Sequence, residues 1–277
     1  MRFASALLVV AVFAAFSPIA RAQAPVPQPA AVAPPAASVA PPSTLSKVLD
    51  DVRLAYNRQE RPMVVFDLDG TLFDNRTRHL QILREYAERE LKTVRPDFAQ
   101  KLLALTIQQV QYRLTDTLTA AGVTEPAVVN NAAVFWSERF FHNDYLRFDT
   151  PNPQAVAFVR SLYSSGARIV YLTARDMQRQ LLGTTRSLYD AGFPIGIQGT
   201  ELIMRPQAQV QDAVFKQSVT NYLRQYGKVI ATFDNETGNA NMFRRAFTEA
   251  HVFLVDAPSS PNQVEALAGV TRLARFE

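Results

Sequence analysis

The stretch MVVFDLDGTL, residues 63–72, carries the strongest structural signal in this 277-residue chain. Four apolar residues, Met63 to Phe66, are followed by Asp67-Leu68-Asp69-Gly70. A continuous apolar run without polar alternation is typical of a strand covered on both faces, as in a parallel sheet. The stretch therefore predicts a buried strand with two carboxylates at its carboxyl end.

Similar apolar runs recur along the chain, and helical patterns separate them. The runs are Ile169–Leu172, Leu202–Met204, Val229–Phe233 and Val252–Val255. Helices are expected from Asn152, with Pro153 as first helical residue, to Gly166, and over about 176–191, 212–226 and 239–250. Alternation of strands and helices with short connections predicts an α/β fold, a Rossmann-like doubly wound parallel sheet.

One segment interrupts the alternation. From about residue 76 to 148 the sequence has helical periodicity and no good strand, with a helix expected after Pro126. The segment follows the first strand directly. We therefore expect an all-helical cap inserted into a folded domain that spans 45–277.

Ligands of open α/β sheets bind beyond the carboxyl ends of the strands. Asp67 and Asp69 follow the first strand, and Asp234 follows the strand at 229–233. Several carboxylates buried together are unfavourable unless a cation neutralises them. A hard, oxygen-preferring divalent ion, Mg²⁺, is therefore the expected cofactor.

These residues resemble the haloacid dehalogenase-like superfamily, whose members are mostly phosphatases. Its first motif, an apolar run followed by Asp-x-Asp-Gly-Thr-Leu, is intact at residues 64–72. Thr173 after an apolar strand matches the second motif, and Lys216 at a helix start matches the third. Asp234, with Glu236 or Asn239, matches the fourth. The resemblance includes a helical cap of the C1 type, placed between the first two motifs.

The resemblance implies a chemical role for each matching residue. Asp67 is the expected nucleophile, forming an aspartyl-phosphate. Asp69 is expected to protonate the leaving oxygen and then to activate water. Asp67, Asp234 and the backbone carbonyl of Asp69 are the expected Mg²⁺ ligands. The remaining assignments form two groups: Thr173, Lys216, Ala174 and Gly70 for the phosphate, and Asn235, Glu236, Asn239 and Arg175 as supporting residues.

Some alternatives remain open within this assignment. The sequence does not choose between Glu236 and Asn239, and Arg175 either pairs with Asp176 or touches substrate. An aspartate at position 69 favours phosphoryl transfer over dehalogenation, because a halide needs no proton. A phosphomutase, another phosphotransferase, and a catalytically silent metal- or phosphate-binding protein are the rival functions. The expected substrate is a small phosphorylated molecule.

Composition excludes several other classes of protein. The chain has no cysteine, which rules out disulfides, thiolate catalysis and cysteine-based metal sites. Its formal net charge is only +4, and no basic run accompanies it, so no nucleic-acid partner is expected.

The first 44 residues differ in composition from the rest. Residues 1–22 have the pattern of a secretory signal: Arg2, an apolar stretch from Phe3 to Phe16, and a small-x-small site ending at Ala22. That stretch is shorter than the roughly 20 residues of a membrane-spanning helix. Residues 23–44 are rich in Pro and Ala and predict an extended linker. We therefore expect an exported protein, periplasmic or secreted, with no membrane span after cleavage; retention of the signal as an anchor is the alternative.

Overall fold

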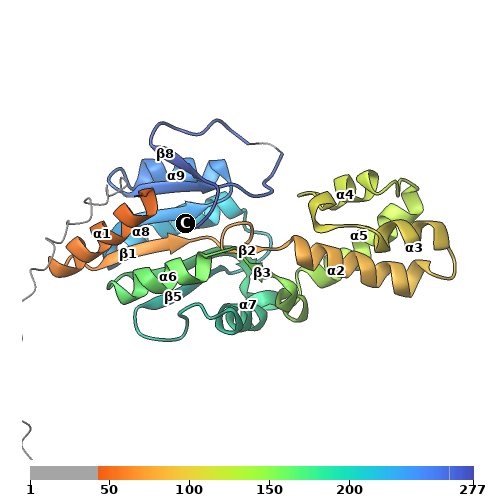
Figure 1. Ribbon diagram of the computed structural model, residues 1–277, viewed down its shortest axis with the longest axis horizontal. Helices are drawn as coiled ribbons and strands as arrows, with labels where there is room; N and C mark the ends of the chain where they lie inside the picture. Colours follow the sequence, from red (N-terminus) through yellow and green to blue (C-terminus); the bar gives the residue numbers. More distant parts are fainter. Residues whose placement is uncertain (1–42, 262) are drawn as a thin grey trace, which may run out of the picture. The chain divides into compact units, whose positions relative to one another are not determined.

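A six-stranded parallel sheet forms the centre of the computed structural model, which describes residues 43–261 and 263–277. The predicted signal sequence and all but the last two residues of the predicted linker lie outside these residues. The strand order is β5-β4-β1-β6-β7-β8, with β1 near the middle (Figure 1). The strands are β1 Pro62–Phe66, β4 Arg168–Asp176, β5 Thr200–Arg205, β6 Lys228–Asp234, β7 His251–Val255 and β8 Val270–Leu273.

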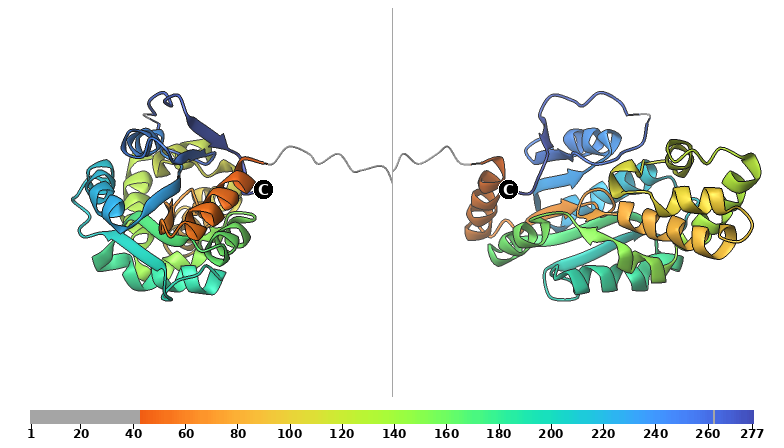
Figure 2. Two further views of the ribbon diagram at one scale, coloured as in Figure 1. Left: turned by 90° about the vertical axis from the view of Figure 1, so that its left-hand side faces the viewer. Right: turned by 45° about the vertical axis from the view of Figure 1, so that its right-hand side comes forward.

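Helices cover both faces of this sheet, as the views in Figure 2 show. The helices are α1 Thr44–Asn57, α6 Ala155–Ser164 and α7 Met177–Ala191 on one face, and α8 Asp212–Tyr226 and α9 Thr237–Ala246 on the other. Side chains of β1 alternate between these two layers. Val64 and Phe66 pack in the core with α1 and α6, whereas Met63 and Val65 pack in the core with α8 and α9. Two-sided burial explains why this strand is continuously apolar.

A helical insertion lies between β2 Phe73–Asp74 and β3 Thr150–Pro151, two short strands that pair antiparallel. It has a hydrophobic core of its own. Because β2 and β3 pair, the outgoing and returning chains of the insertion meet at the carboxyl end of β1. The insertion consists of α2 Arg76–Tyr86, a π-helical turn Ala87–Leu91, α3 Pro96–Leu103, a 3-10 turn Ile107–Gln109, α4 Leu114–Ala120, α5 Pro126–Phe140 and a 3-10 segment Asn143–Phe148.

The structure confirms the predicted fold class and differs from the sequence interpretation in detail. Helix α6 begins at Ala155, so the prediction of Pro153 as first helical residue is wrong; Gln154 has φ +64°, which cannot continue a helix. Strand β8 was not predicted, because its sequence, VTRL, has no continuous apolar run. The pair β2–β3 was not predicted because each strand has only two residues.

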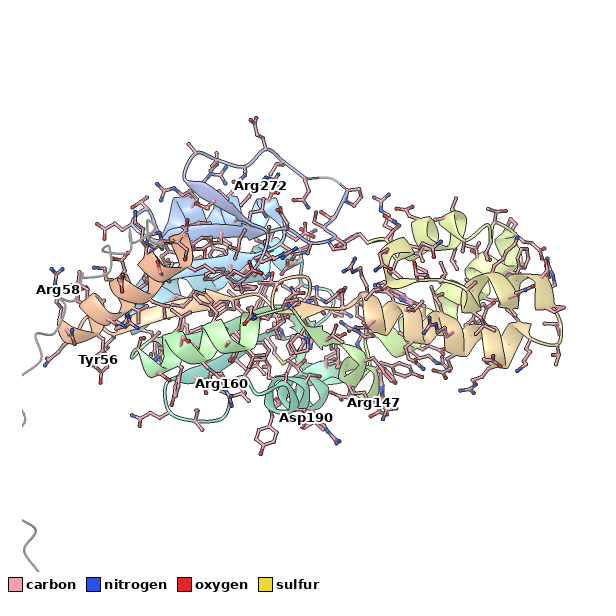
Figure 3. The ribbon with its side chains drawn as sticks, in the orientation of Figure 1. Tyr56, Arg58, Arg147, Arg160, Asp190 and Arg272 are labelled. Atoms are coloured by element: carbon pink, nitrogen blue, oxygen red, sulfur yellow. The ribbon has the colours of Figure 1, made fainter. Side chains whose placement is uncertain are left out.

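Polar and charged side chains are exposed on the outer faces of α1, α6 and α7. Tyr56 on α1, Arg160 on α6 and Asp190 on α7 project away from the sheet (Figure 3). Within residues 43–261 and 263–277, no helix is both long and apolar enough to cross a membrane.

Candidate active site

A tight turn after β1 brings Asp67 and Asp69 into one cavity. The backbone N–H of Asp67 still donates to the carbonyl of Phe233 on β6 (2.9 Å), so Asp67 is fixed by the sheet. Gly70 then turns the chain with φ +78°, and a Cβ atom there would lie 2.4 Å from Nδ2 of Asn235. Both the conformation and the close contact require glycine. We therefore assign Gly70 a part in shaping the turn.

Lys216 joins the acids at the ends of two neighbouring strands. Its Nζ donates to Oδ1 of Asp67 (2.9 Å) and to Oδ2 of Asp234 (2.8 Å), and all three side chains are at least nine-tenths buried. Asp67 follows β1, Asp234 ends β6, and Lys216 lies on α8, which packs over that face. Three residues that the sequence motifs singled out are thus in direct contact.

Two further side chains belong to this group, Asp212 and Asn239. Asp212 Oδ2 lies 3.7 Å from Lys216 Nζ and accepts a hydrogen bond from Asn239 Nδ2 (3.0 Å). Asn239 Nδ2 also donates to Asp234 Oδ1 (3.2 Å). Sequence analysis did not identify Asp212, although its spacing of four residues before Lys216 on one helix was the available signal.

Negative charge exceeds positive charge in this group. Three carboxylates, Asp67, Asp212 and Asp234, surround the single ammonium of Lys216. Burial, with the nearby Asp234 and Asp212, raises the pKa of Asp67 to about 8 although Lys216 opposes the shift. Burial also raises the pKa of Asp234, and the surrounding carboxylates raise the pKa of Lys216 well above its usual value.

Asp69 has a different environment, because two arginines hold its carboxylate. Arg175 donates from Nε to Oδ2 (2.8 Å) and from Nη2 to Oδ1 (2.9 Å), the bidentate arrangement that planar guanidinium favours. Arg78 of the cap donates from Nη2 to Oδ1 (2.6 Å). These arginines hold the pKa of Asp69 well below its ordinary value, although its partial burial opposes the shift.

Asp149 completes the second group by bridging the same two arginines. Its Oδ1 accepts from Arg78 Nε (2.8 Å) and its Oδ2 from Arg175 Nη2 (2.7 Å). Burial raises the pKa of Asp149 to about 6 even between two cations. Arg78 lies in the first turn of α2, the first helix of the cap, and Asp149 follows the last helical segment of the cap. The chain that enters the cap and the chain that leaves it therefore both contribute to holding Asp69.

The alternative that Arg175 pairs with Asp176 is wrong. Asp176 instead caps α7, accepting from the Arg179 N–H (3.0 Å) and side chain. An irregularity in β4 explains the difference: Thr173 pairs with Met204 of β5, whereas the next paired residue is Asp176, leaving Ala174 and Arg175 as extra residues. Such a bulge redirects side chains, and here the side chain of Arg175 reaches Asp69.

The side chains of Asn235 and Glu236 contact the loop after β7, and Glu236 reaches Asp234 only through its backbone N–H, which donates to Asp234 Oδ1 (2.9 Å). Asn235 Nδ2 donates to the carbonyl of Pro258 (3.0 Å), and the Glu236 carboxylate accepts from the backbone and hydroxyl of Ser260 (both 2.8 Å). Of the two alternatives for the fourth motif, it is therefore Asn239 whose side chain contacts Asp234. Glu236 still lines the cavity.

The two groups of ionisable side chains share one cavity of about 260 Å³. Core and cap both contribute walls, the cap through the aromatic side chains Tyr112, Phe140 and Phe141 among others. Of the residues predicted from sequence, the following line the cavity: Asp67, Asp69, Gly70, Thr173, Ala174, Arg175, Lys216, Asn235 and Glu236. Asp234 and Asn239 are buried beside it.

The oxygen atoms around Lys216 are chemically suited to a hard divalent cation. Asp212 Oδ1 is buried and has no hydrogen-bond partner among the residues that the structure describes. The group carries more carboxylates than the one lysine can neutralise. Mg²⁺ is usually held by one or two carboxylates together with water. Within residues 43–261 and 263–277, no group of three or more His, Cys, Asp or Glu side chains has metal-binding geometry. Asp67 and Asp234 therefore fit such an ion.

Fold and site define a Rossmann-like α/β protein whose helical insertion contributes walls to a cavity with strand-end carboxylates. No protein-family model and no curated protein matches the chain. Among solved structures it is similar to a candidate phosphatase from Clostridium difficile, with 16% identity over 73% of this chain and 88% of that one, and a TM-score of 0.49.

Two other solved structures have comparable scores. One is Protein Tyrosine Kinase A from Mycobacterium tuberculosis, with 18% identity, 78% and 94% coverage and a TM-score of 0.49. The other is a haloacid dehalogenase-superfamily hydrolase from Geobacter sulfurreducens, with 13% identity, 77% and 92% coverage and a TM-score of 0.46. At these values, function has to be inferred from the residues of the site.

Proposed function

We propose that the protein is a Mg²⁺-dependent, haloacid dehalogenase-like phosphatase that hydrolyses a small phosphomonoester through an aspartyl-phosphate. The observation that carries this proposal is the buried Lys216, which lines the cavity together with Asp67, Asp69 and Thr173 and bridges Asp67 to Asp234 beside it. Such a reaction needs three groups: a nucleophilic carboxylate, a cation beside it, and a second carboxylate two residues further along the chain.

Asp67 acts first in this mechanism. One of its carboxylate oxygens attacks phosphorus, and the bond between phosphorus and the ester oxygen breaks. Thr173 and the ammonium of Lys216 bind phosphoryl oxygens, since positioning and charge stabilisation account for most of the catalysis in phosphoryl transfer. The high pKa of Lys216 keeps it charged throughout.

Asp69 moves protons in both steps. In the first it protonates the leaving oxygen, and in the second it takes a proton from the water that attacks phosphorus and releases Asp67. Arg175 and Arg78 hold Asp69 ionised, which is the form that activates water. For the first step Asp69 has to take up a proton from solvent before it can donate one, which requires these ion pairs to weaken when the phosphoryl group binds.

Mg²⁺ would be held by Asp67, Asp234 and the backbone carbonyl of Asp69, with Asp212 and Asn239 beside them. When bound, it neutralises the repulsion between an anionic nucleophile and an anionic phosphate. The excess of carboxylates around Lys216 and the unpartnered Oδ1 of Asp212 support this assignment.

The cap favours a small substrate over a phosphorylated protein. The cavity holds about 260 Å³, and cap residues such as Tyr112 and Phe141 form part of its wall. A cavity of this kind excludes water from the reacting groups and admits only small molecules.

Hydrolysis of p-nitrophenyl phosphate, followed with and without Mg²⁺, tests the proposal. We expect Mg²⁺-dependent release of phosphate by the wild type and the control Asp190→Asn, whose side chain is exposed on α7, and none by Asp67→Asn. Full activity of Asp67→Asn, or no activity of the wild type across a panel of phosphate esters, would exclude this function. A product in which phosphate has moved to a second hydroxyl would indicate a phosphotransferase or phosphomutase instead.

We further propose that the protein is exported. Support comes from the signal-like pattern of residues 1–22, whose removal would lower the formal net charge from +4 to +2 through the loss of Arg2 and Arg21. N-terminal sequencing of the mature protein tests this. A mature chain starting at Gln23 supports export with cleavage, and one that retains Met1 contradicts a cleaved signal peptide.

A further inference from the structure

Arg205 differs from the other basic side chains of the cavity in having no carboxylate partner. Arg76, Arg78, Arg175 and Lys216 each form an ion pair with at least one aspartate. Arg205 lines the same cavity, and none of the acidic side chains in the described ranges forms an ion pair with it. Its positive charge is therefore available to a ligand.

The hydrogen bonds of Arg205 are also incomplete. Nη1 donates to the carbonyl of Val210 (2.9 Å), which ties the side chain to the loop before α8. Nε is buried and finds no acceptor in the part of the chain that the structure describes. A purely structural arginine would satisfy its buried N–H groups. The bond to Val210 accounts for one donor of five and leaves the charge uncompensated.

The position of Arg205 separates it from the phosphoryl site. Arg205 ends β5, the edge strand, and pairs in register with Asp176, beyond the pair Thr173–Met204. Strand β4 lies between β5 and β1, which precedes Asp67. Neighbouring strands are about 4.8 Å apart, so the backbone of Arg205 is roughly 10 Å to the side of Asp67. An anion bound at Arg205 would then occupy the β5 side of the cavity, beside a phosphoryl group bound at Asp67.

We propose that Arg205 binds a second anionic group of the substrate, a carboxylate or a second phosphate, and so selects phosphate esters that carry two anions. Guanidinium binds either anion in bidentate fashion. Tyr112 of the cap lines the same cavity as Arg205 and the acids Glu236 and Asp212 of the core. The substrate would therefore lie between β5 and the cap. This inference rests on the proposed phosphatase function.

Matched pairs of phosphate esters test the selection. One pair is 3-phosphoglycerate and glycerol 3-phosphate, which differ by a carboxylate. The other is propane-1,3-diol bisphosphate and its monophosphate, which differ by a phosphate. We expect the wild type to prefer the doubly anionic member of at least one pair by roughly tenfold or more in kcat/KM, the size of a charge-assisted hydrogen bond. The pair that shows the preference identifies the second anion.

Variants assign the preference to Arg205. In Arg205→Gln, which retains a donor for the Val210 carbonyl, the ratio of the two kcat/KM values should fall to about one. Arg205→Lys should restore part of the ratio because it restores the charge. Arg76→Gln is the matched control, since Arg76 lines the cavity but is neutralised by Asp74 (2.7 Å), and its ratio should remain that of the wild type.

Failure of this inference is distinguishable from failure of the proposed function. Turnover of all four esters without preference, or a preference that Arg205→Gln retains, overturns the role of Arg205 and leaves the phosphatase intact. If no ester is turned over, calorimetric titration of wild type and Arg205→Gln with all four esters decides. Selective binding of the doubly anionic member of either pair by the wild type alone supports the anion site, and equal binding of both members in both pairs contradicts it.

Discussion

Asp67 and Asp69 are two residues apart in sequence, yet their carboxylates lie in opposite electrostatic environments. Asp67 shares one ammonium, that of Lys216, with Asp234 and Asp212. Asp69 is held by the two guanidinium groups of Arg175 and Arg78. Burial and neighbouring acids raise the pKa of Asp67 to about 8, whereas the arginines lower the pKa of Asp69 far below its ordinary value.

Because their electrostatic environments differ, the carboxylates of Asp67 and Asp69 are suited to different chemical roles. Environments that push apart the pKa values of neighbouring acids are a usual means of giving them separate functions. The group around Asp67 has excess negative charge and suits a divalent cation, whereas the group around Asp69 is balanced, with Asp149 as its second acid. The predictions that follow disturb one group or the other.

The largest effect is expected for Lys216→Met, which removes the only cation from the group around Asp67. Activity should fall about 10³-fold, because a charge that stabilises the transferring phosphoryl group is lost. The free energy of unfolding should fall by about 3–5 kcal/mol at neutral pH, since buried carboxylates lose their partner. Steady-state kinetics and urea unfolding measure the two effects. Wild-type kinetics in this variant would contradict the assignment of Lys216.

Replacing Arg175 disturbs the other group. In Arg175→Gln the pKa of Asp69 should rise, so the acidic limb of the pH profile of kcat, which reports the ionised Asp69 that activates water in the second step, should move to higher pH. Arg179→Gln is the matched control, because Arg179 pairs with Asp176 outside the group. An acidic limb at the same pH in wild type and Arg175→Gln would show that Arg175 does not set the ionisation of Asp69.

Mg²⁺ should stabilise the folded protein through Asp67 and Asp234. At a concentration one hundred times its dissociation constant, the expected gain in the free energy of unfolding is about 2.7 kcal/mol. Thermal unfolding with and without Mg²⁺ measures it, and Asp234→Asn should lose most of the gain. The exposed variant Asp190→Asn should retain it. An equal Mg²⁺ effect in wild type and Asp234→Asn would place the ion elsewhere.

The smallest effect concerns His79 of the cap, which is buried beside Arg78 and accepts a hydrogen bond from Trp136 Nε1 (3.1 Å). Burial, with the charge of Arg78, lowers the pKa of His79 from 6.5 to about 3. The folded protein thus binds fewer protons than the unfolded chain between these values. The contribution of the neutral His79 side chain to the stability of the folded protein is complete above pH 6.5 and decreases as the pH falls towards 3.

At pH 5 this loss should amount to about 2 kcal/mol relative to pH 7.5. In His79→Gln, which can still accept from Trp136 but does not titrate, the loss should be absent. Urea unfolding of both proteins at the two pH values measures the difference. Identical pH dependence in the two would show that His79 is not the titrating group.

Sequence reasoning predicted the first group of acids better than the second. Asp67 and Asp234 follow long apolar runs, so the rule for the carboxyl ends of parallel strands places them together. Lys216 required the resemblance to a family, because a lysine on a helix has no local signal. Asp212 was missed although it precedes Lys216 by one helical turn.

Asp69 and Arg175 of the second group were named from sequence, but their contacts with Arg78 and Asp149 could not be predicted, because these depend on how the chain returns from the cap. Arg78 and Asp149 are 71 residues apart and meet only after the cap has folded and β2 has paired with β3. The orientation of Arg175 depends on a bulge in β4 that no residue type signals. That Arg205 has no carboxylate partner among the described residues can likewise be seen only once the positions of the neighbouring carboxylates are known.

Trapping of the covalent intermediate tests the central claim most directly. Wild-type protein is quenched in acid during turnover of p-nitrophenyl phosphate with Mg²⁺, reduced with borohydride, digested and analysed by mass spectrometry. We predict reduction of the carboxyl group of Asp67 to homoserine, which requires an acyl-phosphate at this residue, and none in protein quenched without substrate. Reduction at another carboxylate, or turnover with Asp67 never reduced, would contradict the assignment of Asp67 as the nucleophile.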